Sequence, residues 1–312
     1  FGDKLSPLSD TTNLAPAMAG GELFSHIRYM SLTTIPSIVI TLIVFLILSL
    51  TQETTGQADT LMLMAAIKEK FTINGWLFLV PASVIVLIVK KSPPLIALLV
   101  GTLMGGIFAL VFQSDILLEI THSSILTSEV AYRAIMDAIS VSTEITTSNA
   151  LLNDLFTSGG MEGMLGTIWL IICAMVFGGI MDAIGALERI SNALLNWAQT
   201  TFQLFASTVA SCLAINLTAS DQYLSIVIPG KMFAKAYRDR KLAPENLSRT
   251  LEDSGTVTSV LIPWNTCGAY QSGVLGVGVG EYFVYAIFNW ISPFMTLLYA
   301  AFDIKIKALK EK

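Results

Sequence analysis

The chain has 312 residues, of which 54% are hydrophobic and only 13% are charged, and its formal net charge is −5. A soluble domain carries roughly 25% charged residues, so most of this surface must face lipid. This excludes a cytosolic enzyme and a disordered chain, and the negative charge excludes a nucleic-acid binder, which needs a basic field. Cys173, Cys212 and Cys267 show no metal-ligand spacing, so we expect neither a disulfide framework nor a bound cofactor.

Uncharged runs of about 20 residues predict membrane-spanning helices. In chain order, the predicted spans are residues 33–50, 73–89, 93–112, 163–182, 201–219 and 282–302. Pro81 predicts a kink in the second of them. Residues 221–230 are too few to cross the membrane before the basic Lys231, so they predict a re-entrant segment.

The charge pattern predicts the orientation of these spans. Residues 113–162 form an acidic connection, whereas residues 231–249 and the tail 303–312 are basic. The positive-inside rule places the basic segments in the cytoplasm and the acidic connection outside. We therefore expect an integral protein of the bacterial cytoplasmic membrane.

Two stretches, residues 2–22 and 254–280, break the pattern of apolar rods. Each contains a Ser/Thr-rich turn, a Pro, and then an Asn beside a Thr. Pro and Gly leave backbone groups unbonded, and inside a membrane such groups must line a cavity or be buried in protein. The alternative is a pair of ordinary loops, which would usually carry Lys or Arg; residues 254–280 carry none.

The spans that follow the two breaks run in opposite directions by the charge pattern, as in an inverted repeat. The predicted fold is an all-α polytopic membrane protein, an inverted-repeat secondary transporter with discontinuous helices and a re-entrant segment. Residues 1–112 then end the first repeat, and residues 163–302 form the second.

Single carboxylates within apolar sequence are further candidates for function, because burying them is expensive. Asp221 lies between two apolar runs, and it can also cap the helix that follows. Asp182 ends an apolar run, with a solvated residue at the membrane interface as the alternative. We expect His26 and His122 at the surface.

Three runs carry a family resemblance: GDKLSPLSDTTNLAPA (2–17), NLTASDQYLSIVIPGKMF (216–233) and LEDSGTVTSVLIPWNTCGA (251–269). They resemble the NhaC family of sodium/proton antiporters, which belongs to the ion-transporter superfamily of inverted-repeat carriers. The resemblance covers essentially the whole chain and implies exchange of sodium ions for protons. Some members carry organic solutes such as malate and lactate, or amino acids, so it does not fix the cargo. It also implies helices upstream of Phe1, so we expect the sequence to be truncated at its N-terminus.

By that resemblance, the two breaks and the polar insertion around Asp221 hold the ion- and substrate-binding candidates. These are Asp3, Ser9, Asp10, Thr11, Thr12, Asn13, Thr218, Ser220, Asp221, Asp253, Asn265 and Thr266, with Asp182 as a further candidate. Within this set we expect the transported sodium ion at Asp10, Asn13, Asp221 and Asn265. Because a desolvated Asp can hold either a proton or a sodium ion, Asp10 or Asp221 is the expected exchanging carboxylate.

Other classes of function fit the residues less well. An intramembrane aspartyl protease could use Asp10 and Asp221 as a pair, but the sequence has no GxGD run. A channel remains an alternative, as does a sodium- or proton-coupled carrier of organic anions or amino acids. We predict a secondary active transporter rather than an enzyme. Its expected partners are the lipid bilayer, sodium ions and protons, with a small organic solute and a homodimer left open.

Overall fold

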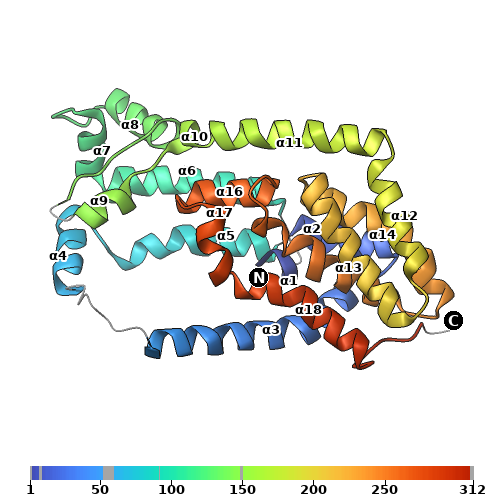
Figure 1. Cartoon of the computed structure of the whole chain (residues 1–312). Coiled ribbons are helices and arrows are strands. Elements are labelled where there is room, and N and C mark those ends of the chain that lie inside the picture. The colour runs from blue at the N-terminus through green and yellow to red at the C-terminus, as the bar shows by residue number, and fades with distance from the viewer. Residues whose placement is uncertain (1, 7–8, 52–59, 91, 148–149, 310–312) are drawn as a thin grey trace. The chain divides into compact units, whose positions relative to one another are not determined.

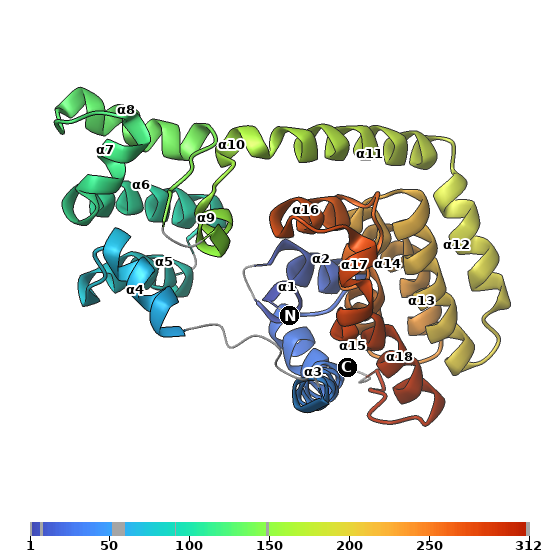
Figure 2. The same ribbon diagram turned by 60° about the vertical axis from the view of Figure 1, so that its left-hand side comes forward.

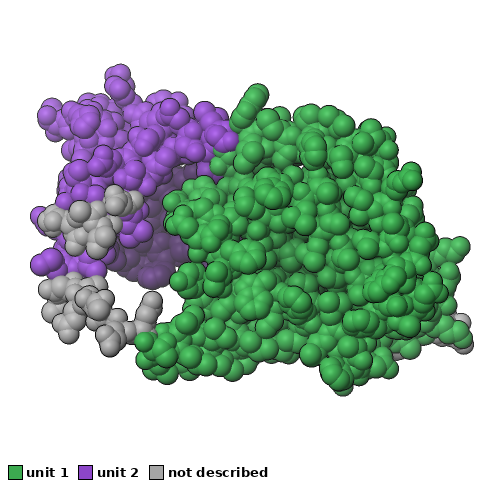
Figure 3. All heavy atoms as spheres, viewed as in Figure 1, with its two compact units in different colours: residues 1–52, 167–312 green, residues 53–166 purple. Residues whose placement is uncertain are grey.

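All regular structure in the described part of the chain is helical (Figures 1 and 2). The computed structural model describes residues 2–6, 9–51, 60–90, 92–147 and 150–309. Within these ranges the only β-type pairings are two isolated bridges, so the predicted all-α fold class is confirmed. The chain forms two compact units, residues 1–52 with 167–312 and residues 53–166 (Figure 3).

The smaller unit contains two strongly apolar helices, α5 and α6, and several short ones. Its elements are α4 (Thr60–Lys70), the 3-10 turn η1 (Gly75–Phe78), α5 (Leu79–Val89), α6 (Pro94–Phe112), α7 (Ser114–Thr121), α8 (Ser128–Ser140), α9 (Ala150–Phe156) and α10 (Gly160–Gly163). Lys70 and Glu119 form an ion pair of 2.9 Å that joins α4 to α7. Pro81 does not kink α5, because it lies in the first turn, where its missing N–H has no helical partner to lose.

The larger unit contains the two sequence breaks and most of the buried core. Its elements are α1 (Gly2–Leu5), α2 (Asp10–Ala19), α3 (Leu23–Thr51), α11 (Leu165–Ala183), α12 (Ala186–Trp197), α13 (Thr201–Thr218), α14 (Gln222–Asp239), α15 (Pro244–Leu251), the π turn η2 (Glu252–Thr256), the 3-10 turn η3 (Ser259–Leu261), α16 (Thr266–Leu275), α17 (Val279–Tyr282), the 3-10 turn η4 (Phe283–Tyr285) and α18 (Ile287–Ala301).

The core of the larger unit lies where α2, α13, α14 and α15 meet. Phe205, Ile226 and Leu247 are fully buried there. Helix α2 crosses α14 at Gly230, where an added Cβ would lie 2.6 Å from Cβ of Met18. Only a residue without a side chain allows this close approach. The crossing fixes the N-terminal break beside the start of α14.

Four helices, α3, α6, α11 and α13, are long and apolar enough to cross a membrane. Two bent pairs, Met62–Lys70 with Gly75–Val89 and Val279–Tyr285 with Ile287–Ala301, raise this number to six among the described residues if each pair is one span. Large apolar side chains are exposed on these helices, such as Leu50 of α3 (78%) and Leu95 of α6 (79%). Water would solvate such a surface poorly, whereas lipid solvates it well. The protein is therefore an integral membrane protein.

Several elements differ from the sequence prediction in length or continuity. Helix α3 begins at Leu23 rather than at residue 33. Helix α14 continues through Pro229 to Asp239, beyond the re-entrant segment predicted to end at residue 230. The apolar run predicted as one span over 282–302 is bent by 56° before Ile287.

His26 does not lie at the surface, as the sequence analysis expects. It is fully buried in the first turn of α3. Its Nδ1 lies 2.7 Å from the hydroxyl of Ser248 in α15, in a hydrogen bond whose direction depends on the tautomer. The imidazole therefore joins two helices of the core.

Candidate functional site

The first break separates the short helix α1 from α2, and hydroxyl side chains fasten the two helices together. Ser9 donates through Oγ to a carboxylate oxygen of Asp3 at 2.8 Å. Thr11 and Thr12 donate through Oγ1 to the backbone carbonyl of Asp3 at 3.3 and 2.5 Å. The hydroxyl groups of the Ser/Thr-rich run thus donate hydrogen bonds to backbone groups that the interrupted helix leaves without partners. These bonds also fix the position of Asp3.

The second break begins with the π turn after α15 and ends at the start of α16. Asn265 caps α16, because its Oδ1 accepts a hydrogen bond from the backbone N–H of Cys267 at 3.1 Å. The backbone turn that precedes α16 is tightly packed. A Cβ at Gly268 would lie 2.0 Å from the carbonyl oxygen of Ile262, so only glycine fits this position.

Asn216, near the end of α13, makes hydrogen bonds to residues of the second break. Its Nδ2 donates to the carbonyl of Gly255 at 2.7 Å and to Oγ1 of Thr258 at 3.1 Å. Its backbone carbonyl and its Oδ1 both accept from Nδ2 of Asn265 at 3.2 Å. Asn216 is fully buried, and burial of polar groups is favourable only when they are paired in this way. The sequence analysis did not select Asn216, although an Asn within an apolar helix was a usable signal.

The third polar segment is the turn between α13 and α14. Ser220 has a φ of 58°, which is unusual for a residue with a side chain, and its carbonyl accepts from the backbone N–H of Thr266 at 3.0 Å. Asp221 caps α14, because its Oδ1 accepts from the N–H of Leu224 at 3.0 Å. The turn is therefore tied directly to the second break.

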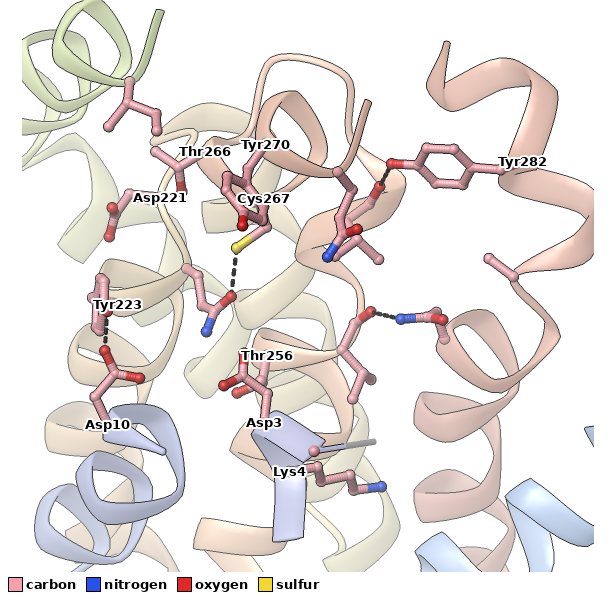
Figure 4. Close-up of a pocket in the computed structure, with 18 of the residues that line it drawn as sticks. Asp3, Lys4, Asp10, Asp221, Tyr223, Thr256, Thr266, Cys267, Tyr270 and Tyr282 are labelled. Carbon is pink, nitrogen blue, oxygen red and sulfur yellow. Dashed lines mark hydrogen bonds between the residues drawn. The ribbon is translucent and has the colours of Figure 1, made fainter. Parts of the chain in front are cut away.

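These three segments line one cavity of about 880 Å³ in the larger unit (Figure 4). Asp3 and Asp10 come from the first break, Asp221 from the turn, and Thr256 and Thr266 from the second break. The other polar lining residues are Lys4, Gln222, Tyr223, Cys267, Tyr270, Gln271, Tyr282, Tyr285 and Asn289. Segments that are far apart in sequence therefore present their oxygen atoms to a single space.

Tyr223 connects the first break to α14 across this cavity. Its hydroxyl donates to Oδ2 of Asp10 (Figure 4), while Oδ1 of Asp10 accepts from the backbone N–H of Thr11 at 2.9 Å. Cys267 donates through Sγ to Oε1 of Gln222 at 2.6 Å. The sequence analysis missed Tyr223 and Gln222, although both follow Asp221 directly in the polar insertion.

Among the described residues that line the cavity, Lys4 is the only one with a cationic side chain. It forms an ion pair with Asp253, and both side chains are fully buried. Asp253 also accepts a hydrogen bond from Oγ1 of Thr296 in α18. Because Asp253 neutralises Lys4, the carboxylates of Asp3, Asp10 and Asp221 leave the cavity with an excess of negative charge, which favours a cation.

The sequence candidates divide into three groups by position. Asp3, Asp10, Asp221 and Thr266 line the cavity, whereas Ser9, Thr11, Thr12, Ser220, Asp253 and Asn265 hold the surrounding backbone or Lys4. Asn13, Thr218 and Asp182 do not line the cavity. Asn13 is exposed and donates to the carbonyl of Ser9 at 2.7 Å, Thr218 donates to Ala214 in its own helix, and Asp182 is exposed at the end of α11. Neither Asn13 nor Asn265 is among the lining residues.

No group of three or more His, Cys, Asp or Glu side chains that could hold a metal ion occurs in the described part of the chain. The cavity instead mixes single carboxylates with hydroxyl and amide groups, which suits an ion that binds and leaves.

Comparison with known proteins identifies the family of the chain. A family model described as "Na+/H+ antiporter family" matches residues 1–304. The chain is 36% identical over 98% of its length to a Na(+)/H(+) antiporter NhaC of Alkalihalophilus pseudofirmus, and 33% identical over 96% to one of Bacillus subtilis. It is 31% identical over 94% to a malate-2H(+)/Na(+)-lactate antiporter of Bacillus subtilis.

The chain spans 63% of the length of the two NhaC relatives and 59% of the malate/lactate relative. No solved structure matches it significantly. The resemblance to NhaC proteins inferred from the three polar runs is confirmed over nearly the whole chain. The chain belongs to the Na+/H+ antiporter family.

Proposed function

We propose that the protein exchanges sodium ions for protons by alternating access, with the cavity between the two breaks as its ion site. The observation that carries the proposal is the convergence of three carboxylates, Asp3, Asp10 and Asp221, on a cavity in which the lining cation Lys4 is neutralised by Asp253. Broken helices that meet at a polar site are the usual construction of secondary transporters.

The donor atoms suit sodium, which is a hard cation and prefers oxygen ligands. Asp10 and Asp221 supply carboxylate oxygens at the cavity wall, and Thr266 lines the same cavity. In this proposal, binding of sodium and binding of a proton exclude one another. If the site opens to one side at a time and moves only when occupied, this competition becomes exchange.

A second candidate keeps the site and adds an organic cargo. The cavity volume of about 880 Å³ falls within the range of roughly 300–1,000 Å³ that is typical of small-molecule sites, and it is larger than a single ion needs. An organic anion would require an unpaired cation at the site, and Lys4 is already paired with Asp253. Uptake of labelled carboxylates and amino acids into vesicles tests this candidate.

We place the protein in a bacterial cytoplasmic membrane, with the basic end of α14 and the C-terminal segment on the cytoplasmic side. Lys235, Arg238 and Arg240 lie at or near the end of α14, and Lys305 and Lys307 follow α18. Basic residues beside spans favour the cytoplasm.

The direct test of antiport is sodium-driven proton flux in vesicles that contain the full-length protein. Asp10→Asn and Asp221→Asn each remove one cavity carboxylate and are expected to abolish the flux. Asp182→Asn is the matched control, because Asp182 is exposed and does not line the cavity. Undiminished flux in both cavity variants would remove this assignment.

A further inference from the structure

Glu252 is a fully buried carboxyl group that the proposed ion site does not use. It is the first residue of the π turn after α15, and its exposed fraction is 0%. Neither of its carboxylate oxygens makes a hydrogen bond to any protein group that the structure describes, and no ion pair to Glu252 occurs in the same ranges. Leaving a buried acid without a partner is costly, so this position calls for an explanation.

Lys4 and the other carboxylates near Glu252 are engaged with other residues. Asp253 in the same turn pairs with Lys4 of α1, Asp3 of α1 accepts from Ser9, and Asp10 of α2 accepts from Tyr223. Arg249 of α15 is buried and its guanidinium nitrogens make no hydrogen bond among the described residues, but the group lies over the rings of Tyr29 and Tyr299 at 4.5 and 5.6 Å. Of the remaining titratable groups on α13, α14 and α15, Cys212, Tyr237 and Glu245 are buried, and Lys231, Lys235, Arg238 and Asp239 are exposed.

An isolated ionised carboxylate costs far more to bury than a neutral carboxylic acid. Without a counter-ion, Glu252 is therefore stable at this place with a proton bound. Thr256 links the carboxyl group of Glu252 to the cavity. Thr256 lies in the same π turn, its side chain lines the cavity, and its hydroxyl makes no hydrogen bond among the described residues. Short π segments within helices occur frequently at functional sites.

We propose that Glu252 carries a transported proton, separate from the carboxylates that bind sodium. This inference rests on the proposed antiport function. When sodium enters the cavity, the O–H bond of Glu252 breaks and its electron pair stays on the carboxylate. The Thr256 hydroxyl accepts that proton and passes its own proton to water in the cavity. The charge of the sodium ion then replaces that of the proton, so the net charge of the site is unchanged.

The first test is infrared spectroscopy of the full-length protein in lipid at neutral pH. The carbonyl stretch of a protonated carboxylic acid is expected in the wild type and lost in Glu252→Gln. Glu245→Gln is the matched control, because Glu245 is ionised in an ion pair with Lys307 and contributes no such band. Gln is close in size to a protonated Glu, so the variant is expected to fold. Identical acid bands in the wild type and in Glu252→Gln would overturn the inference and leave the antiport proposal standing.

The second test asks whether this proton moves. Saturating sodium is expected to reduce the acid band in the wild type, and Thr256→Val is expected to slow its exchange in heavy water. An acid band that stays constant while calorimetry shows sodium bound to the same sample would overturn the carrier role. Absence of sodium binding to the wild type would instead refute the antiport proposal, and this inference with it.

Transport gives a third, independent readout. Glu252→Gln is expected to lose sodium-driven proton flux and to retain exchange of labelled sodium for unlabelled sodium, which needs no proton. Glu252→Asp keeps an acid at this position and is expected to recover part of the proton flux. Loss of sodium–sodium exchange in Glu252→Gln, or full proton flux in it, would contradict a separate proton site.

Discussion

Lys4 and Asp253 lie in the two different chain breaks and form an ion pair in which both side chains are fully buried. The pair links α1 directly to the π turn after α15. It also neutralises Lys4 in a cavity whose other charged side chains, among the described residues, are acidic. The ion pair is therefore both a structural link between the breaks and a reason for the cavity to select a cation.

Breaking this pair from one side is expected to destabilise the protein. Lys4→Met leaves the charge of Asp253 buried and unpaired, which costs about 3–5 kcal/mol. The double variant Lys4→Met with Asp253→Asn removes both charges and is expected to regain most of that loss. Thermal unfolding of the purified variants measures both effects. Equal stability of Lys4→Met and the wild type would contradict the observed pairing.

A substitution of Asn216 tests which hydrogen bonds stabilise the second break. Asn216→Leu keeps a similar volume but leaves the carbonyl of Gly255 without its 2.7 Å donor. The unfolding free energy is expected to fall by about 1–3 kcal/mol, the cost of an unsatisfied buried polar group. Thr218→Val is the matched control in the same helix, because Thr218 bonds only its own helix backbone. Equal losses in the two variants would show that Asn216 has no special role.

Asp221 has two roles that different substitutions separate. Asn caps a helix about as well as Asp, whereas Ala costs about 1 kcal/mol. Asp221→Asn is therefore expected to unfold like the wild type and Asp221→Ala at a lower temperature, although both remove the cavity charge. Calorimetric unfolding of the two variants measures the difference. A large loss of stability in Asp221→Asn would mean that the charge, rather than the cap, holds this turn.

The sequence predicted the positions of both breaks because Pro, Gly and uncharged polar residues interrupt otherwise apolar runs there. It predicted less well where helices continue or bend. Pro229 lies inside α14 without ending it, and α18 begins after a 56° bend at Ala286, where no Pro or Gly marks a break. Tertiary packing determines whether a helix continues or bends at such a position, and the local sequence carries no signal of that packing.

The candidate site was predictable in part for the same reason. Asp3, Asp10 and Asp221 lie in polar runs and were selected, and all three line the cavity. The pairing of Lys4 with Asp253 and the bond from Tyr223 to Asp10 join residues far apart in sequence. A single sequence contains no signal for such contacts.

The contact of the C-terminal segment with α15 predicts a pH effect on stability. Burial opposes ionisation of Glu245, but hydrogen bonds from Lys307 and Ser25 outweigh it, so the pKa of this carboxyl lies below its ordinary value of 4.5. The pair therefore stabilises the protein above pH 4.5, and its contribution is lost as the pH falls through the lower folded value. Because Lys307 is partly exposed, the effect is at most about 1 kcal/mol.

Unfolding temperatures measured as the pH is lowered through 4.5 test this prediction. The wild type is expected to lose stability more steeply in that window than Glu245→Gln, which cannot titrate. Lys307→Met is expected to lie between them, because Ser25 still donates to Glu245 at 2.5 Å. Parallel curves for all three proteins would contradict the assigned role of the pair.

The most direct test of the account is calorimetric sodium binding to the purified full-length protein. The wild type and Asp182→Asn are expected to bind sodium alike, because Asp182 lies outside the cavity. The variants Asp10→Asn and Asp221→Asn are expected to show no heat of sodium binding. Both are still expected to unfold cooperatively on heating, as folded proteins do. Unchanged sodium affinity in both cavity variants would contradict the claim that the two chain breaks meet at the ion site.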